Sequence, residues 1–103
     1  MKVIIVGGGA SGLMAALTAS ERPDARVVLL ERQARVGRKL LATGNGRCNL
    51  TNLGADASHY HGAAPEFVKP ALERFGVRRT LDYFRALGLL TVAEADGKVY
   101  PLS

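Results

Sequence analysis

The sequence predicts an α/β fold that begins with a strand–helix–strand unit and continues with two helices and a β-hairpin. Two short runs of continuous apolar residues, at 2–7 and 26–31, have the composition of parallel strands buried on both faces. A glycine-rich turn and a short apolar segment separate the two runs. This spacing predicts a βαβ unit with a right-handed crossover. The length of 103 residues allows one small domain.

The first half of the chain supplies the βαβ unit. We expect a buried strand over Lys2–Gly7, a helix over Leu13–Ser20 that is apolar on most sides and therefore buried, and a second buried strand over Arg26–Glu31. Residues 35–52 are expected to be mostly irregular, with one helical turn near Arg38–Leu41.

The second half is expected to contain an exposed loop over 54–65, two amphipathic helices and the hairpin. The first helix has Pro70 in its first turn, where proline is tolerated, and Gly76 as its cap. The second helix ends at Gly88. The hairpin turns at Asp96-Gly97. The apolar stripes that pack the two helices are Val68, Leu72 and Phe75, then Val77, Leu81, Phe84 and Leu87.

The composition limits the classes of function. A net charge of +5, from 14 Lys and Arg against 9 Asp and Glu, favours anionic partners. The basic residues are scattered, which disfavours a dedicated nucleic-acid arm. A single cysteine excludes an intrachain disulfide and favours a cytoplasmic location. The first apolar run is too short for a signal peptide or a membrane span, so no membrane partner is expected. His59 and His61 without a third ligand make a poor metal site, so no metal is expected.

The glycine-rich turn has the G-x-G-x-x-G spacing of a dinucleotide site. Gly7 permits the tight turn, Gly9 lets a pyrophosphate approach the backbone, and Gly12 lets the helix pack close to the strand. The free amides at the helix start attract phosphates. The motif and its setting predict a Rossmann-like domain that binds FAD or NAD(P). An ordinary loop is the alternative.

Glu31 ends the second strand, 19 residues after Gly12. A carboxylate there would accept hydrogen bonds from the adenosine ribose and repel a 2′-phosphate, which disfavours NADP in this site. A solvated strand end is the alternative. The arginines and the Gly-Arg-Lys that follow in "ERQARVGRK" favour a flavin dinucleotide over a simple NAD domain.

The stretch "LLATGNGRCNLTN" is too polar for a core strand and too rich in glycine for a helix interior. Gly44 and Gly46 permit backbone angles that other residues avoid, so amides there can approach a flat ring closely. Arg47 can offset negative charge on a pyrophosphate or a reduced flavin. Asparagine side chains both donate and accept, as a flavin edge requires. The alternative is a polar surface loop that is held by its own Asx turns.

Four segments carry a resemblance that covers nearly the whole chain in order. "GGGASGLMAA", "LLERQARVGRKLLATG", "TGNGRCNLTN" and "GKVYPLS" resemble the amino-terminal part of the BaiN-like family of NAD(P)/FAD-dependent oxidoreductases. The resemblance implies an FAD domain interrupted by a substrate domain, NAD(P)H as the electron donor, and a small-molecule substrate such as a steroid-like enone.

The resemblance also assigns cofactor contacts. It places the pyrophosphate at Gly7, Gly9, Ser11 and Gly12, the ribose at Glu31, and the adenosine side at Arg38 and Lys39. The residues that it places beside the flavin are Thr43, Gly44, Asn45, Gly46, Arg47, Cys48 and Asn49.

Residues 1–103 are expected to be the amino-terminal part of an incomplete FAD-binding domain, because family members are several times longer. We expect the remainder of that domain and the substrate domain to be absent, and the fragment itself to be inactive. No catalytic residue is assigned. Cys48 is interpreted as a packed residue in preference to a reactive thiol. Tyr83 and Tyr100 are interpreted as packing residues in preference to proton donors.

The leading hypothesis is an FAD-dependent oxidoreductase that takes a hydride from NAD(P)H and passes it to an unsaturated organic substrate. A nucleotide-binding module without turnover is the second hypothesis. An RNA-modifying flavoprotein, indicated by the positive charge, is the third. The sequence leaves open the substrate, the choice between NADH and NADPH, and the oligomeric state.

Overall fold

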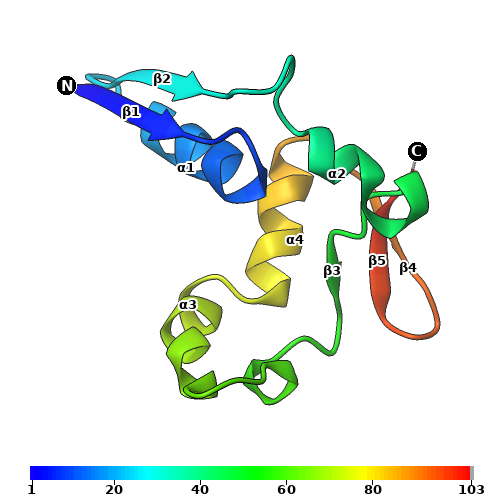
Figure 1. Cartoon of the computed structure of the whole chain (residues 1–103). Helices are drawn as coiled ribbons and strands as arrows, with labels where there is room; N and C mark the ends of the chain where they lie inside the picture. The colour runs from blue at the N-terminus through cyan, green and yellow to red at the C-terminus, as the bar shows by residue number, and fades with distance from the viewer. Residues whose placement is uncertain (103) are drawn as a thin grey trace. The chain divides into compact units, whose positions relative to one another are not determined.

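The structure is a computed structural model that describes residues 1–102. Contacts divide the chain into two compact units, Met1–Gly46 and Arg47–Ser103. Figure 1 shows the order of the elements along the chain. No helix in residues 1–102 is long and apolar enough to cross a membrane.

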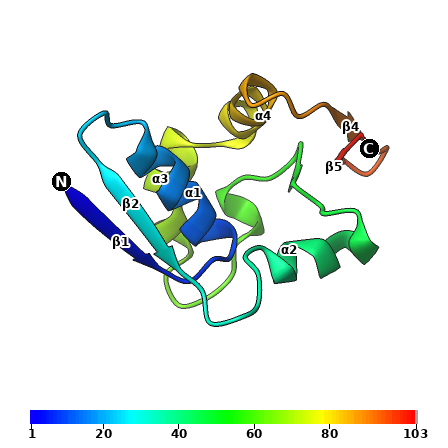
Figure 2. The same cartoon turned by 90° about the horizontal axis from the view of Figure 1, so that it is seen from above.

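The first unit contains the predicted βαβ unit. Strand β1 (Lys2–Val6) and strand β2 (Arg26–Leu30) are parallel, and helix α1 (Ala10–Ser20) connects them. The register pairs Lys2 with Arg26 and Val6 with Leu30. Helix α1 lies along one face of the strand pair (Figures 1 and 2). The α/β Rossmann-like prediction is therefore confirmed for this unit.

The prediction that these strands and the helix are fully buried is wrong. Ile5 faces α1 and is half-buried, but Ile4 and Val6 on the opposite face are 55% and 83% exposed. Helix α1 has no fully buried residue. The physical reason is that this sheet has only two strands and the helix covers only one of its faces. A continuous apolar run predicts a strand but does not fix how many of its faces are covered.

Helix α1 begins at Ala10, three residues earlier than predicted. The Leu13 N–H donates to the Gly9 carbonyl at 2.9 Å, so the first turn of the helix already includes Gly12. The predicted helical turn after β2 is confirmed as helix α2 (Arg38–Ala42), which is followed by a short turn, η1 (Thr43–Gly46).

The second unit is built on an antiparallel sheet of order β3-β5-β4. Strands β4 (Thr91–Ala93) and β5 (Lys98–Pro101) form the predicted hairpin, and Gly97 has a positive φ of 85° in its turn. Strand β3 (Thr51–Asn52) also pairs with β5. Strand β3 is a correction, because residues 35–52 were expected to be mostly irregular. A strand of two residues has no period that a sequence pattern can show.

The remaining elements of this unit are mostly as predicted. A 3₁₀ turn η2 (Ala57–His59) lies in the expected loop, and a 3₁₀ turn η3 (Pro65–Val68) leads into helix α3 (Lys69–Arg74). Pro70 lies in the first turn of α3, as expected.

The helix caps are only partly as predicted. Gly76 was expected to end the first helix, but Phe75 ends α3, and Gly76 begins helix α4 (Val77–Ala86) with an extended backbone. Gly88 has a φ of 89° just past the end of α4, as predicted. Its positive φ is the left-handed conformation that commonly ends a helix.

The buried centre of the second unit lies on β5. Among residues 1–102, Val99 and Tyr100 are the buried hydrophobic residues, with 1% and 7% of their surface exposed. The Tyr83 ring meets the rings of Phe75 and Phe84 edge-on, at centroid distances of 5.8 and 5.5 Å. Both tyrosines are therefore packed, as the sequence indicated.

Candidate nucleotide-binding site

The turn between β1 and α1 has the backbone geometry that its glycines predict. Gly7 has a φ of 101°, and its N–H donates to the Leu30 carbonyl at 2.7 Å. A Cβ on Gly12 would collide with the Gly7 carbonyl oxygen, so only glycine allows this close packing. A Cβ on Gly9 would meet nothing within 4 Å. The backbone at Gly9 is therefore open to an approaching group.

Gly8 is a structural residue that the sequence analysis missed. Its N–H donates to Glu31 Oε2 at 2.8 Å, and its carbonyl accepts the Gly37 N–H at 2.7 Å. An added Cβ would lie 2.7 Å from Val36 Cγ1. Gly8 therefore connects the turn after β1 to the segment before α2. The signal was present as the uninterrupted "GGG", of which the motif uses only the outer two glycines.

Backbone amides hold the carboxylate of Glu31 at the end of β2. Gln33 N–H donates to Oε1 at 2.9 Å and Gly8 N–H donates to Oε2 at 2.8 Å. The Gln33 amide first, and then the Gly8 amide, lowers the pKa of Glu31 below its ordinary value, because both hydrogen bonds favour the charged form. A carboxylate has about four lone-pair sites, so each oxygen can accept a further hydrogen bond.

These segments surround a cleft of about 440 Å³. It joins the glycine turn, the end of β2 and the first turn of α2. Gln33 and Ala42 are lining residues that the sequence analysis missed, because nothing in the motif marks them. Gly7, Ser11 and Gly12 lie in the same turn without lining the cleft. The lining residues are Gly8, Gly9, Glu31, Gln33, Arg38, Lys39 and Ala42.

The cleft combines cations, open backbone and a fixed anion. Arg38 and Lys39 line it, and Arg38 Nη1 donates to Gln33 Oε1 at 2.9 Å. Cations beside the amino-terminal end of α1 attract phosphate groups, and the Glu31 carboxylate can accept from hydroxyl groups. This donor and acceptor set fits the ADP half of a dinucleotide.

The turn after α2 has the unusual backbone that its glycines predict. Gly44, Asn45 and Gly46 have positive φ angles of 58°, 55° and 82°. Asparagine is among the few residues other than glycine that tolerate this region. The Thr43 hydroxyl donates to the Leu40 carbonyl at 3.0 Å. The backbone prediction is confirmed, while the flavin contact that the resemblance assigns to this turn stays a prediction.

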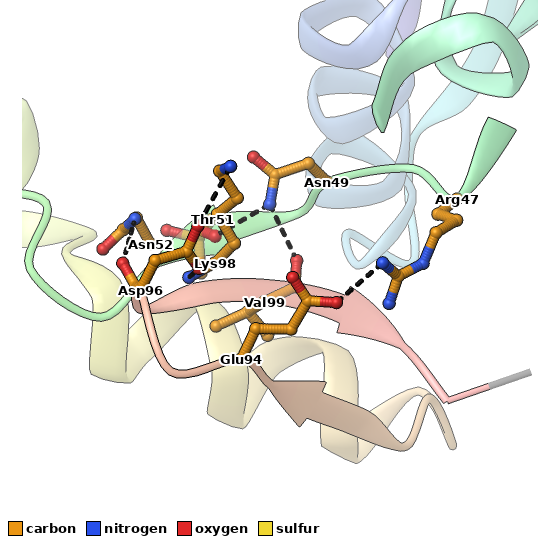
Figure 3. A network of polar contacts seen from close by, with 8 residues as sticks. All are labelled: Arg47, Asn49, Thr51, Asn52, Glu94, Asp96, Lys98 and Val99. Carbon is orange, nitrogen blue, oxygen red and sulfur yellow. Dashed lines mark hydrogen bonds and ion pairs between the residues drawn. The ribbon is translucent and has the colours of Figure 1, made fainter. Parts of the chain in front are cut away.

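Arg47 lies in the second unit and has partners within that unit (Figure 3). Its Nη1 is 2.7 Å from Glu94 Oε1. Its guanidinium also lies 3.9 Å from the centre of the Tyr100 ring. The hydrogen bond to Glu94 raises the pKa of Arg47. The role proposed for Arg47 toward a cofactor stays a prediction.

The asparagines that follow hold the sheet of the second unit. Asn49 Nδ2 donates to the carbonyls of Thr51 and Val99 at 3.1 Å, and Asn52 Nδ2 donates to the Asp96 carbonyl at 3.3 Å (Figure 3). These bonds connect the stretch after Arg47 to β5 and its turn, and the flavin contact that the resemblance assigns to Asn49 stays a prediction.

Cys48 is half-buried and has a φ of 56°. Within residues 1–102, no group of three or more His, Cys, Asp or Glu side chains is placed to hold a metal ion. His59 instead contacts Asp56, with Nδ1 at 3.2 Å from Oδ1.

Comparison with known proteins identifies the family. The family model described as the HI0933-like protein Rossmann domain matches residues 1–103. The 3-dehydro-bile acid delta(4,6)-reductase of Clostridium scindens is 50% identical over 103 residues, which cover 99% of this chain and 25% of that protein.

Two further relatives are named ribosomal RNA dihydrouridine synthases. The Escherichia coli protein is 42% identical over 97 residues, covering 94% of this chain and 24% of that protein. The Haemophilus influenzae protein is 40% identical over 72 residues, covering 70% of this chain and 18% of that protein. The chain therefore spans a quarter or less of the length of these curated relatives.

Proposed function

The chain belongs to the HI0933-like protein Rossmann-domain family, and we propose on that basis that it holds the ADP half of FAD in an NAD(P)H-dependent oxidoreductase. The cleft beside Gly9 carries this proposal, because it combines open backbone, two cations and a fixed carboxylate. When bound, FAD supplies hydride transfer from NAD(P)H to an unsaturated organic substrate.

Each group in the cleft has a defined task in this proposal. The backbone at Gly9, directly before α1, binds the pyrophosphate. Arg38 and Lys39, which the resemblance assigns to the adenosine side, line the same cleft and offset the pyrophosphate charge. Glu31 orients the ribose through the lone pairs that its two backbone partners leave free. A charged Glu31 also repels a 2′-phosphate, which disfavours NADP in this cleft and does not restrict the choice of NADH or NADPH as the electron donor.

The relatives support a reductase of carbon–carbon double bonds. One is named a delta(4,6)-reductase of a 3-dehydro-bile acid. This name supports a small unsaturated substrate, such as a steroid-like enone, for the present protein. We also propose that the protein acts in the cytoplasm, which its single cysteine favours.

An RNA-modifying flavoprotein is the second candidate function. It is favoured by the two relatives named ribosomal RNA dihydrouridine synthases, at 42% and 40% identity. Both candidate functions use the same cleft for the same cofactor. They are distinguished by the substrate, a small enone or an RNA, that is reduced and restores the flavin absorbance after NADH or NADPH has bleached it under anaerobic conditions. A nucleotide-binding module would bind FAD without any such turnover.

The substitution Gly9→Val tests the proposed cleft. Gly9 has a φ of −83°, which valine can adopt, and a Cβ there meets no protein atom within 4 Å. The variant should therefore fold while its side chain fills the pyrophosphate path. We expect FAD affinity to fall at least about tenfold, which corresponds to about 1.4 kcal/mol.

Ala15→Val is the matched control, because it places the same valine side chain at an exposed position of α1. Affinity is measured by calorimetry, and folding by circular dichroism. A folded Gly9→Val protein that binds FAD as tightly as the Ala15→Val control would contradict the proposed site.

A further inference from the structure

Gln33 connects two of the three charged side chains of the cleft, Glu31 and Arg38. It lies in the segment between β2 and α2, a connection that Figure 2 shows between the two labelled elements. Its backbone N–H donates to Glu31 Oε1 at 2.9 Å. Its side-chain oxygen accepts from Arg38 Nη1 at 2.9 Å. All three residues line the cleft.

Backbone hydrogen bonds hold the segments on both sides of Gln33. Gly37 N–H donates to the Gly8 carbonyl at 2.7 Å, which ties the residue before α2 to the glycine turn. The second oxygen of Glu31 is held by Gly8. The carboxylate and the base of α2 are thus positioned by backbone, and the Arg38 guanidinium is positioned by the Gln33 side chain.

The acceptor at position 33 determines both the orientation and the net charge of the Arg38 guanidinium. A carboxylate at position 33 would orient the guanidinium and also cancel its charge. A glutamine amide oxygen is a neutral acceptor, so it orients the guanidinium while the full positive charge remains available to an anion. An arginine without a partner would keep its charge but lose its orientation, because its long side chain has many rotamers.

We propose that Gln33 is a positioning residue that holds the Arg38 guanidinium at the cleft as an uncancelled cation for the phosphates of the bound nucleotide. The inference rests on the proposed function, since it requires that the cleft bind an ADP group. It adds a residue outside the glycine motif and predicts how that residue acts.

Two substitutions separate orientation from charge. Gln33→Met keeps the length of the side chain and the backbone bond to Glu31 but removes the acceptor oxygen. Gln33→Glu keeps the acceptor oxygen but adds a negative charge. We expect Gln33→Met to weaken ADP binding about 3- to 10-fold. The variant loses the one hydrogen bond between Gln33 and the charged Arg38 guanidinium, and both side chains are partly solvated. We expect Gln33→Glu to weaken binding and also to flatten its dependence on salt.

The proposal is tested with a double-mutant cycle on the purified protein, with ADP as the probe at two salt concentrations. The proteins are wild type, Gln33→Met, Arg38→Met and the double variant. If Gln33 acts through Arg38, Gln33→Met has no further effect once Arg38 is replaced. Additive losses would mean that Gln33 contacts the nucleotide directly, and would overturn the positioning role.

The cycle also separates failure of this inference from failure of the proposed function. If wild type binds ADP and Gln33→Met binds it equally well with an unchanged salt dependence, only the positioning role is overturned. If wild type binds neither ADP nor FAD, both the proposed function and the positioning role of Gln33 are overturned. Circular dichroism confirms that each variant is folded before its affinity is compared.

Discussion

Individual residues at the glycine turn have separable roles, and Gly9 and Gly12 show this most clearly. The space around Gly9 is open, whereas Gly12 is in contact with the Gly7 carbonyl. The spacing of the motif predicted both roles from the sequence, because each follows from backbone geometry. The sequence did not predict Gly8 and Gln33, because their partners are set by how the two turns meet in space.

At the residue scale, we expect Gly12→Ala to destabilise the first unit by about 1 to 3 kcal/mol, the cost of overpacking. The added methyl group would collide with a carbonyl oxygen, and the helix would have to move away from β1. The measurement is urea unfolding followed by circular dichroism. Gly9→Ala is the control, with a much smaller expected loss. Equal losses for the two variants would contradict the close packing at Gly12.

The Glu31 carboxylate gives a second prediction at this scale. Two backbone amides lower its pKa in the folded protein, so its charged form is stabilised by folding. The ordinary pKa of a glutamate is about 4.3. The stabilisation is therefore fully present above that pH and is lost as the pH falls through the lowered folded-state pKa.

Glu31→Gln should accordingly show a flatter dependence of melting temperature on pH than wild type, between about pH 5 and 3. The control is Glu21→Gln, which removes the carboxylate of an exposed residue and leaves both amide hydrogen bonds to Glu31 in place. Parallel curves for wild type and Glu31→Gln would show that the two amides do not hold the charged carboxylate.

Individual elements were predictable where their signal is local. The strands and helices follow from apolar runs and helical periodicity, and the hairpin follows from its Asp-Gly turn. The pairing of β3 with β5 was not predictable, because residues almost fifty positions apart form it. It was also not predictable that only one face of β1 is covered, because the strand's own sequence does not specify which elements pack against it.

At the element scale, the central strand β5 should carry most of the stability of the second sheet. Tyr100 is buried, so Tyr100→Ala should cost about 3 kcal/mol of unfolding free energy. Glu94→Gln should shift the denaturation midpoint only slightly, because exposed ion pairs contribute little. Urea denaturation of both variants checks this order. A larger loss for Glu94→Gln than for Tyr100→Ala would contradict it.

The whole molecule shows a large apolar surface on the first unit. Ile4, Val6 and Leu30 are each more than half exposed. Replacing Ile4 and Val6 by threonine in the 103-residue chain should therefore change its unfolding free energy by less than about 1 kcal/mol and reduce binding of an apolar dye. A large loss of stability would show that another surface, such as a second copy, covers this face in solution.

The central claim is that this chain holds the ADP half of FAD. The most direct measurement is a fluorescence titration of FAD with the purified protein, followed by competition with ADP and, separately, with FMN. We predict that ADP displaces FAD and that FMN does not, because the cleft groups are assigned to a pyrophosphate and the adenosine ribose, which ADP carries, whereas FMN has one phosphate and no adenosine. Displacement by FMN without displacement by ADP, or no binding of FAD, would contradict the claim.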